Sequence, residues 1–389
     1  MTNLHVSWVT NIPAPYRNHR YRRMAEIFPR FEIDFDVMYM AWTEPDRHWS
    51  FEPDDLAYPH RVYPGVHPRI RGADLHANPS LLWRLWHTPR DVVVVGGYNS
   101  PTHALAPFCC PATSVKLLES ESNPQSEHRS SELARWLKRF LVSQYDAYIG
   151  PGHRSRDFLS QIDPAAATKP FIEFPNLVDE AVFARGVARE RVRQQEIRRE
   201  LGLSDETRLW ICPARLEEFK GLHLLLPLLE GVTGIELLVA GEGSLRSDLQ
   251  AMIDARRLPV RLLGHQREAE MVRLYAAADL FVLPSLRDPS PLSPIEACAA
   301  RLPILASRRI GNFEDVVVEG NNGWGFDPGG GAESQDLVKR VASLSRGDLA
   351  QMGERSAVLY REGFDSNRCI ARLAEGIREV HARHVERAS

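Results

Sequence analysis

Residues 209–283 constrain the fold more than any other part of the chain, because strand-like and helix-like segments alternate there in a fixed order. The region opens with LWICPARLEEFKG, continues with IELLVAGEGSLRSDL, and closes with VRLLGHQREAEMVRLYAAAD and LFVLPS. Its short apolar runs read as buried strands, and the patterns between them read as amphipathic helices. This alternation predicts a parallel sheet that is covered by helices on both faces.

Basic residues and glycines follow the first two of these strands. Arg215 and Lys220 lie in the loop after the first strand. Gly241 and Gly243 form the turn after the second strand, and this turn leads into a helix that we expect to begin at Ser244. Ligands of open parallel sheets bind at the carboxyl ends of the strands. The sequence therefore predicts a ligand site at this edge of the sheet.

The loop LRDPSPLSPIEACAA, which follows the last strand, adds two carboxylates. Asp288 and Glu296 are separated by three prolines, which disfavour a helix in the first part of the loop. Glu296 then falls in the first turn of the next helix. A carboxylate there can accept hydrogen bonds from sugar or ribose hydroxyls, while Arg215 and Lys220 can donate to a diphosphate. The combination predicts a nucleotide-sugar site.

The chain resembles the retaining glycosyltransferases of the GT-B fold, family 4 (glycosyl transferases group 1). The resemblance rests on PARLEEFKG, VAGEGSLRSDL, LLGHQREAEMVRLYAAADLFVLPS, DPSPLSPIEA and FPNLVDEAVF, and it covers roughly residues 140–330. It implies an α/β protein in which two Rossmann-like, doubly wound parallel-sheet domains face each other across a cleft. The amino-terminal third resembles the family only loosely.

The resemblance also implies roles for individual residues. Arg215 and Lys220 would bind the donor diphosphate and neutralise the leaving nucleotide. Glu296 would hold the ribose hydroxyls, and Asp288 would lie at the transferred sugar. Further donor contacts are expected from Gly241, Gly243, Leu263, Ser290, Leu292 and Ser293.

The chain departs from the family pattern at two positions. Asp288 is one methylene shorter than the usual Glu. Pro291 stands where the family usually has a glycine whose N–H reaches the donor, and proline cannot donate. That contact is either lost or moved to Ser290, Leu292 or Ser293.

Structural explanations compete with each of these assignments. Arg215 and Lys220 could be solvated surface charges, and the two glycines could serve only a strand-to-helix turn. Asp288 could be a turn former and Glu296 a helix-start acid. We interpret Asn176 and Asp179, in FPNLVDEAVF, as structural residues rather than ligands.

The length of 389 residues suits two domains. We expect an amino-terminal acceptor-binding domain over residues 1–185 and a donor-binding domain over residues 186–367. Residues 368–389 are expected to cross back to the first domain as a helix. The charged segment 185–200 is interpreted as the interdomain connection and an exposed helix.

The first domain is expected to hold the acceptor at its strand ends. Tyr16, Arg17, Tyr98 and Asn99 are the predicted acceptor residues. Tyr98 stands where many relatives have a histidine.

Two further side chains of this domain are candidates for catalysis. Glu119 could act as the general base for the acceptor hydroxyl. His103 could be catalytic or a satisfied structural histidine. In retaining relatives the departing phosphate can itself take the acceptor proton, so no side-chain base is required.

We expect no metal and no cofactor other than the nucleotide-sugar co-substrate. The only Asp-x-Asp is Asp34-Phe35-Asp36, which lies at the start of a strand rather than at its carboxyl end. The pair Asp54-Asp55 lacks the spacing of a metal-bridging motif.

Composition narrows the choice of partners. The net charge of -3 favours no polyanion, so nucleic acid is not an expected partner. Five cysteines without Cys-x-x-Cys spacing, no leader-like start and no long apolar run lead us to expect a cytoplasmic protein. The basic stretches 15–24 and 134–141 could touch an anionic membrane at its inner face, although a solvated helix face is favoured for both.

Together these features predict a retaining glycosyltransferase that moves a sugar from a nucleotide diphosphate, expected to be uridine-linked, to a hydroxyl acceptor without a metal. Two alternatives stay open. One is a nucleotide-sugar epimerase of the same architecture. The other is a non-catalytic nucleotide-sugar-binding protein, which Pro291 and the missing histidine make conceivable.

Overall fold

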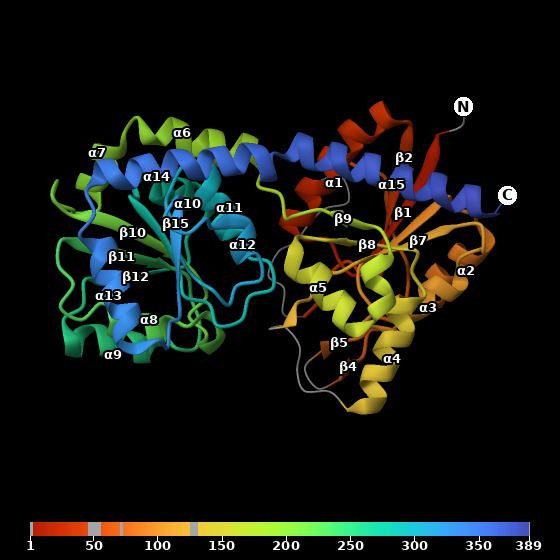
Figure 1. Ribbon diagram of the computed structural model, residues 1–389, viewed down its shortest axis with the longest axis horizontal. Helices are drawn as coiled ribbons and strands as arrows, with labels where there is room; N and C mark the ends of the chain where they lie inside the picture. The colour runs from red at the N-terminus through yellow and green to blue at the C-terminus, as the bar shows by residue number, and fades with distance from the viewer. Residues whose placement is uncertain (1–2, 46–55, 71–72, 125–130, 389) are drawn as a thin grey trace. The chain divides into compact units, whose positions relative to one another are not determined.

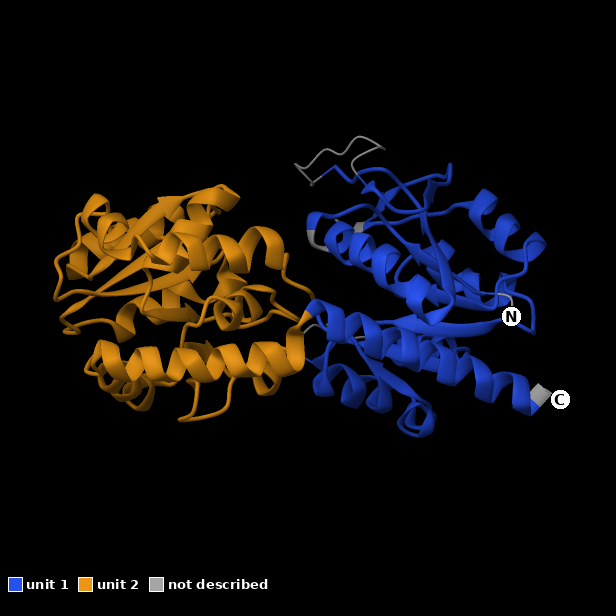
Figure 2. Cartoon of the chain, turned by 90° about the horizontal axis from the view of Figure 1, so that it is seen from above, with its two compact units in different colours: residues 1–175, 366–389 blue, residues 176–365 orange. Residues whose placement is uncertain are grey.

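The computed structural model describes residues 3–45, 56–70, 73–124 and 131–388 (Figure 1). The chain forms two compact units (Figure 2). Unit 1 comprises residues 1–175 and 366–389, and unit 2 comprises residues 176–365. Both units are α/β, as the sequence predicts.

Unit 1 is built on a seven-stranded parallel sheet with the order β3-β2-β1-β6-β7-β8-β9. The central strand β6 is four consecutive buried valines, a composition typical of a parallel strand covered on both faces. The strands are β1 (Leu4–Thr10), β2 (Ile33–Tyr39), β3 (His60–Val62), β6 (Val92–Val95), β7 (Val115–Glu119), β8 (Ala147–Gly150) and β9 (Phe171–Glu173).

Helices flank this sheet, and the last helix of the chain is one of them. Helix α15 packs against α1, η1 and β9 of unit 1 and buries Ile370, Leu373 and Ile377. The remaining elements of the unit are α1 (Pro15–Ile27), η1 (Phe28–Phe31), α2 (Pro79–His87), α3 (Pro101–Cys109), α4 (Glu132–Ser143), α5 (His153–Ile162), η4 (Pro164–Thr168), α15 (Ser366–Ala388) and the hairpin of β4 (Arg69–Ile70) and β5 (Ala73–Asp74).

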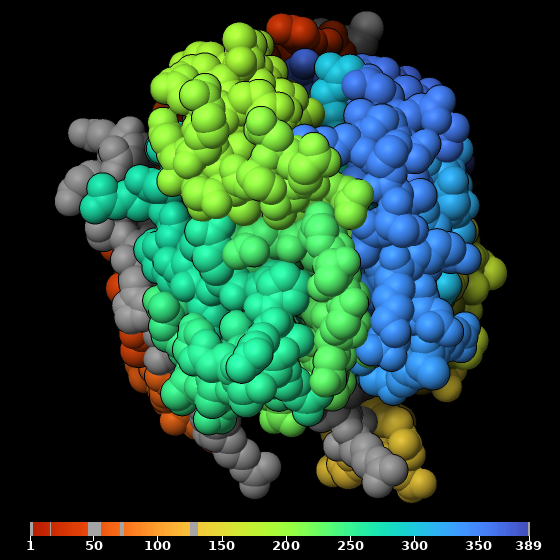
Figure 3. Space-filling model, turned by 90° about the vertical axis from the view of Figure 1, so that its left-hand side faces the viewer, coloured from red at the N-terminus to blue at the C-terminus, as the bar shows by residue number. Residues whose placement is uncertain are grey.

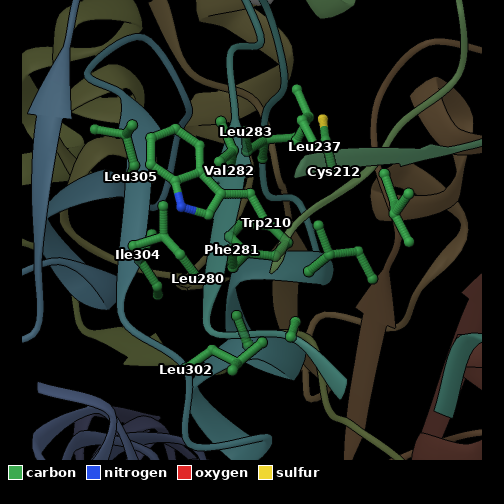
Figure 4. Close-up of a cluster of buried hydrophobic side chains, with 14 of the residues drawn as sticks. Trp210, Cys212, Leu237, Leu280, Phe281, Val282, Leu283, Leu302, Ile304 and Leu305 are labelled. Carbon is green, nitrogen blue, oxygen red and sulfur yellow. The ribbon is translucent and has the colours of Figure 1, made fainter. Parts of the chain in front are cut away.

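Unit 2 is built on a six-stranded parallel sheet with the order β12-β11-β10-β13-β14-β15. The Trp210 indole of β10 is buried in its core, among side chains of β13 and β14 (Figure 4). The strands are β10 (Arg208–Pro213), β11 (Ile235–Ala240), β12 (Val260–Gly264), β13 (Leu280–Leu283), β14 (Ile304–Ser307) and β15 (Gly323–Phe326).

The helices of unit 2 bring distant parts of the chain together. Arg346 of α14 donates to the Thr207 carbonyl at 2.6 Å, so the blue carboxyl-terminal segment lies beside the green chain leading into β10 (Figure 3). These elements are η5 (Glu180–Ala184), α6 (Arg185–Arg191), α7 (Gln194–Glu200), η6 (Glu218–Lys220), α8 (Leu222–Leu228), α9 (Arg246–Arg256), α10 (Glu268–Ala277), α11 (Ser293–Ala299), α12 (Phe313–Val316), α13 (Gly331–Ala342), α14 (Arg346–Leu359) and η7 (Tyr360–Phe364).

The charged segment 185–200 differs from its prediction. It forms two helices, α6 and α7, that belong to unit 2, and the units divide between Pro175 and Asn176 instead of near residue 185. Val187 and Ile197 are buried in the core of unit 2, and the buried Arg198 pairs with Asp279 at 2.8 Å. One face of the segment therefore packs against the core of unit 2, because a few apolar residues and one paired arginine are enough to bury one side of a largely charged segment.

Helix α9 begins at Arg246 and not at Ser244. The Ser244 N–H and hydroxyl donate to the Glu217 carboxylate at 3.1 and 2.8 Å, and the Leu245 N–H donates to the Leu216 carbonyl at 2.9 Å. These bonds hold the chain in a turn for two more residues.

No helix among the described residues combines the length and the apolar composition needed to cross a bilayer.

Candidate functional site

Lys220 is held by a tight turn that abuts the end of β13. It closes η6, and Gly221 follows with φ 72°. A Cβ at Gly221 would lie 2.1 Å from the Pro284 carbonyl oxygen, so this position requires glycine. The Phe219 carbonyl accepts the N–H groups of Leu286 at 2.9 Å and Arg287 at 3.2 Å. The loop after β10 is thereby fixed to the loop after β13.

Lys220 and Asp288 form an ion pair. Only 15% of the lysine side chain and 14% of the aspartate side chain are exposed, so solvent screens the pair incompletely. The Asp288 carbonyl also accepts the Gly311 N–H at 2.8 Å, which fixes the backbone of the loop. Two residues predicted for the site are therefore in direct contact.

Arg215 is exposed, and its guanidinium lies over the Phe219 ring at 5.0 Å, with Lys220 at 5.7 Å from the same ring. Within the described residues, Arg215 pairs with no carboxylate. Two cations therefore lie close to one aromatic ring.

The glycine turn packs against the Arg215 loop. A Cβ at Gly241 would lie 2.1 Å from the Ala214 carbonyl oxygen, and one at Gly243 would lie 2.4 Å from that of Leu216. The Leu216 N–H donates to the Glu242 carbonyl at 2.9 Å. Close approach of two backbones accounts for both glycines, and a contact between this turn and phosphate stays a prediction.

The loop after Asp288 is fixed by two asparagines. Asn176 donates to the Ser290 carbonyl at 2.9 Å, and Asn312 donates to the Pro291 carbonyl at 2.9 Å. Asp179 accepts from the N–H groups of Ala181 and Val182 at the start of η5. These contacts match the structural interpretation of Asn176 and Asp179.

Glu296 lies in the first turn of α11, as expected. Its carboxyl accepts a hydrogen bond from the Tyr275 hydroxyl at 3.0 Å. Burial raises the pKa of Glu296 to about 7, although the Tyr275 hydrogen bond opposes this change. Leu292 caps the same helix, Ser293 begins it, and Leu263 lies half-buried in β12.

Strand order brings these groups to one edge of the sheet. Strand β10 lies between β11 and β13, and all three are parallel. The loops that carry Arg215, Gly241 and Asp288 leave the carboxyl ends of these strands. The result is two cations, one paired carboxylate and one weakly acidic carboxyl at an edge where such sheets bind ligands.

Glu119 in unit 1 is not arranged as a general base. Its carboxylate pairs with the buried Arg20 and accepts the Trp8 indole N–H at 2.7 Å. Burial alone would raise the pKa of Glu119, but the Arg20 charge and these hydrogen bonds hold it below its ordinary value. This ion pair argues against the base role for Glu119, which stays a prediction.

The predicted acceptor residues stand at strand ends of unit 1. Arg17 donates to Thr10 at 3.0 Å and to Asn11 at 2.8 Å, at the carboxyl end of β1. Tyr98 is half-buried with the Lys138 ammonium 5.5 Å from its ring, and Asn99 is exposed. The side chain of Tyr16 lies outside the described residues. Acceptor binding by these residues stays a prediction.

His103 occupies α3 and is only 6% exposed. Its Nδ1 lies 3.1 Å from the Ser100 hydroxyl, and its Nε2 has no hydrogen-bond partner among the described residues. Burial and the charges of His76 and Arg17 lower its pKa to about 3. The imidazole is therefore neutral at neutral pH, and it suits a buried hydrogen-bonding role better than proton transfer.

Sequence reasoning missed a polar network at the ends of β1 and β2. The Glu44 carboxylate accepts from Asn11 at 2.9 Å and lies 3.0 Å from His76 Nε2. His76 Nδ1 in turn lies 2.9 Å from His67 Nδ1. Asn11 and Glu44 each follow a predicted strand, and this position is the signal by which the sequence could have indicated them. The two histidines lie in an irregular segment, whose position the sequence does not predict.

Groups of three or more His, Cys, Asp or Glu side chains arranged to hold a metal ion are absent from the described residues. Asp36 accepts from Ser7 at 2.6 Å and from His5 at 3.1 Å. Burial alone would raise the pKa of Asp36, but these hydrogen bonds and Arg90 hold it below its ordinary value. Asp54-Asp55 lies outside the described residues.

Comparison with known proteins gives a family match for most of unit 2. Residues 193–357 match the family model described as glycosyl transferases group 1. The sulfoquinovosyl transferase SQD2 of Arabidopsis thaliana is 29% identical over 222 residues, which are 54% of this chain and 42% of that protein. A glycogen synthase of Mycobacterium tuberculosis is 36% identical over 233 residues, which are 57% of this chain and 52% of that enzyme. The chain thus spans about half or less of the length of these curated relatives.

The fold extends over nearly the whole chain. The structure of HepE from Anabaena in complex with UDP superposes with a TM-score of 0.74 at 16% identity, covering 97% of this chain and 100% of that chain. This similarity confirms the predicted GT-B fold.

Proposed function

We propose that the chain transfers a sugar from a nucleotide diphosphate donor to a hydroxyl acceptor, because residues 193–357 match the glycosyl transferases group 1 family model. The observation that carries the proposal is the pair of cations on the Phe219 ring, Arg215 without a carboxylate partner among the described residues and Lys220 beside Asp288. Both cations stand at the strand ends where an anionic ligand of this fold is expected.

The donor we propose is a uridine-linked sugar. UDP is the ligand of the HepE structure, which supports this choice. Arg215 and Lys220 would hold the diphosphate, since a guanidinium can bind two phosphate oxygens at once and an ammonium acts as a compact charge. Glu296 would accept hydrogen bonds from the ribose hydroxyls once it is ionised.

The ion pair keeps the charges of the site neutralised when no donor is bound. Without donor, Asp288 neutralises Lys220. When the diphosphate binds, its own negative charge can take over that role, and the Asp288 carboxylate becomes available to the sugar hydroxyls.

Bond breakage follows from the same charges. As the bond between the anomeric carbon and the phosphate oxygen breaks, negative charge grows on the diphosphate, and Lys220 and Arg215 stabilise it. We propose that they replace a divalent metal in this step. The Glu119 carboxylate is paired with Arg20. We therefore propose that the departing phosphate takes the acceptor proton. Because this happens on the face of the sugar that the phosphate leaves, the anomeric configuration is retained.

A thermal-shift panel of nucleotide sugars identifies the donor. A ligand at about 100 times its dissociation constant adds about 2.7 kcal/mol to the free energy of unfolding. The donor is then incubated with and without an acceptor panel, and released nucleotide is measured. Release only with acceptor supports transfer, release from donor alone points to an epimerase, and binding without release points to a sensor.

Variants of the site test the assignment of residues. Lys220→Ala should lower turnover by about a hundredfold or more, while donor affinity falls less. The control is Arg256→Ala, an exposed arginine of α9 that pairs with Glu230. Near-full turnover of a folded Lys220→Ala protein would contradict the proposal, as would loss of activity on chelation that magnesium or manganese restores.

A further inference from the structure

Unit 1 exposes an unusual concentration of large apolar side chains. Among the described residues, every exposed Trp, Phe and Leu side chain lies on α2, α3 or α4. We call this the α2–α4 face: Trp83, Trp86, Leu105, Phe108, Leu133, Trp136, Leu137 and Phe140. Isolated exposed apolar residues are ordinary, but contiguous ones mark a surface that something covers.

Ring contacts show that α3 and α4 share one surface. Phe140 stacks on Trp136 and on Phe108, with ring centroids 5.8 Å apart in both pairs. Helix α2, which exposes Trp83 and Trp86, packs against α3.

Helix α4 turns its apolar side outward. Only Leu141 and Val142 of this helix are buried, while Leu133 is 73% and Trp136 is 62% exposed. A surface helix of a globular protein normally buries its apolar stripe. The core of unit 1 therefore does not explain why this helix is amphipathic.

Cations lie on the same helices as the exposed rings. Helices α2, α3 and α4 carry four Arg or Lys residues and one acid, Glu132. Lys138 lies 5.5 Å from the Tyr98 ring and 5.6 Å from the Phe158 ring. Between α4 and α5 is a hollow of about 360 Å³, lined by Arg135, Trp136, Lys138, Arg139, Phe158, Gln161 and Ile162.

We propose that the α2–α4 face docks on an anionic lipid bilayer. Trp136 and Phe140 would enter the interfacial layer, while Arg135 and Lys138 would contact lipid phosphates beside the hollow. Aromatic and cationic side chains on one amphipathic helix are the combination that binds membrane surfaces.

Two other occupants fit less well. In a symmetric contact between two copies of this chain the same patch faces itself, so its cations would face cations. In the core of a protein interface lysine is depleted, whereas Lys138 lies on the same helix as the exposed Trp136 and Phe140. The second basic stretch, residues 15–24, offers no such surface, because Arg20, Tyr21 and Met24 are buried in α1.

Vesicle sedimentation tests the proposal with the full chain and no nucleotide sugar, so its outcome is independent of glycosyl transfer. We expect the protein to sediment with phosphatidylcholine vesicles that contain about one third phosphatidylserine. It should not sediment with phosphatidylcholine alone, and high salt should release it.

Two double variants separate the apolar and the charged contributions. Trp136→Ala/Phe140→Ala should weaken binding about tenfold or more by removing apolar contact, and Arg135→Glu/Lys138→Glu should do the same by reversing charge. The matched controls are Val192→Ala, which is 89% exposed on unit 2, and Arg256→Glu. Both controls should bind as the unaltered protein does.

Several outcomes would overturn the proposal. They are failure to bind anionic vesicles, equal binding to neutral ones, and unchanged binding by both double variants. A Trp136-dependent dimer in light scattering would instead assign the face to self-association.

Discussion

If Glu296 binds the ribose as we propose, its pKa predicts that nucleotide-sugar binding depends on pH in the neutral range. The carboxyl is buried beside Tyr275, and its pKa is about 7 in the free protein. Ribose hydroxyls donate hydrogen bonds, so they favour the ionised carboxylate. Affinity should therefore rise as pH increases through 7 and then level off.

The magnitude follows from the fraction ionised. One unit below the pKa only about a tenth of the carboxyl is charged, so affinity at pH 6 should be roughly tenfold below its plateau. Binding at pH 6 should also release a proton.

The stability of the free protein should follow the opposite trend and fall as pH rises, because the pKa of Glu296 in the folded state lies above the ordinary value of 4.5. The folded state holds the extra proton, so the free energy of unfolding falls by up to about 3 kcal/mol as pH rises from 4.5 to 7.

Calorimetric titration with the nucleotide sugar found in the thermal-shift panel measures both effects. An intact nucleotide sugar is preferable to the free nucleotide, because a terminal phosphate titrates with a pKa near 6 and would add its own slope. Repeating the titration in buffers of different ionisation enthalpy gives the number of protons released.

Glu296→Gln keeps the shape of the side chain and removes its titration, so its affinity should not change between pH 6 and 8. Glu333→Gln, an exposed acid of α13, is the control and should keep the slope. A flat profile in the unaltered protein, or an unchanged slope in Glu296→Gln, would refute the reasoning.

Two further predictions concern stability. Lys220→Ala leaves the largely buried Asp288 carboxylate unpaired and should cost about 2 kcal/mol in chemical denaturation, between the values for surface and buried pairs. Adding Asp288→Ala should recover part of this loss, whereas strictly additive losses would show that the two side chains are uncoupled. Gly241→Ala should cost about 2 kcal/mol or more, because φ is 155° and the new Cβ would meet the Ala214 carbonyl at 2.1 Å. Gly363→Ala, which meets nothing within 4 Å, should change stability little, and similar losses in both glycine variants would argue against the packing role.

Local signals in the sequence located the donor side of the candidate site. Arg215 and Lys220 follow a strand, and Glu296 falls in the first turn of a helix after prolines. The ends of strands and the starts of helices were therefore enough to predict where these three residues lie. The ion pair between Lys220 and Asp288 could not be predicted, because the residues are 68 positions apart and meet only when the Phe219 carbonyl bonds the loop after β13.

Long-range partners also explain what the sequence could not predict. Glu119 ends a strand, as a proton-transfer residue would, but its ion pair with Arg20, 99 residues earlier, leaves no local signal. The division between units was placed too late because a charged segment was interpreted as exposed, whereas Arg198 is buried through its bonds to Asp279 and the Ala277 carbonyl.

Because α15 belongs to unit 1, the two units cannot finish folding in the order in which they are synthesised on the ribosome. Residues 176–365 are contiguous, so unit 2 can complete its core as soon as it emerges. Unit 1 lacks the helix that buries Ile370 and Leu373 against α1 and β9 until all of unit 2 has been made. At ordinary translation rates of about 5 to 20 residues per second, that interval is roughly 10 to 40 s. During this time the apolar side chains of α1 and β9 that α15 later covers are exposed, and a chaperone would be expected to bind there.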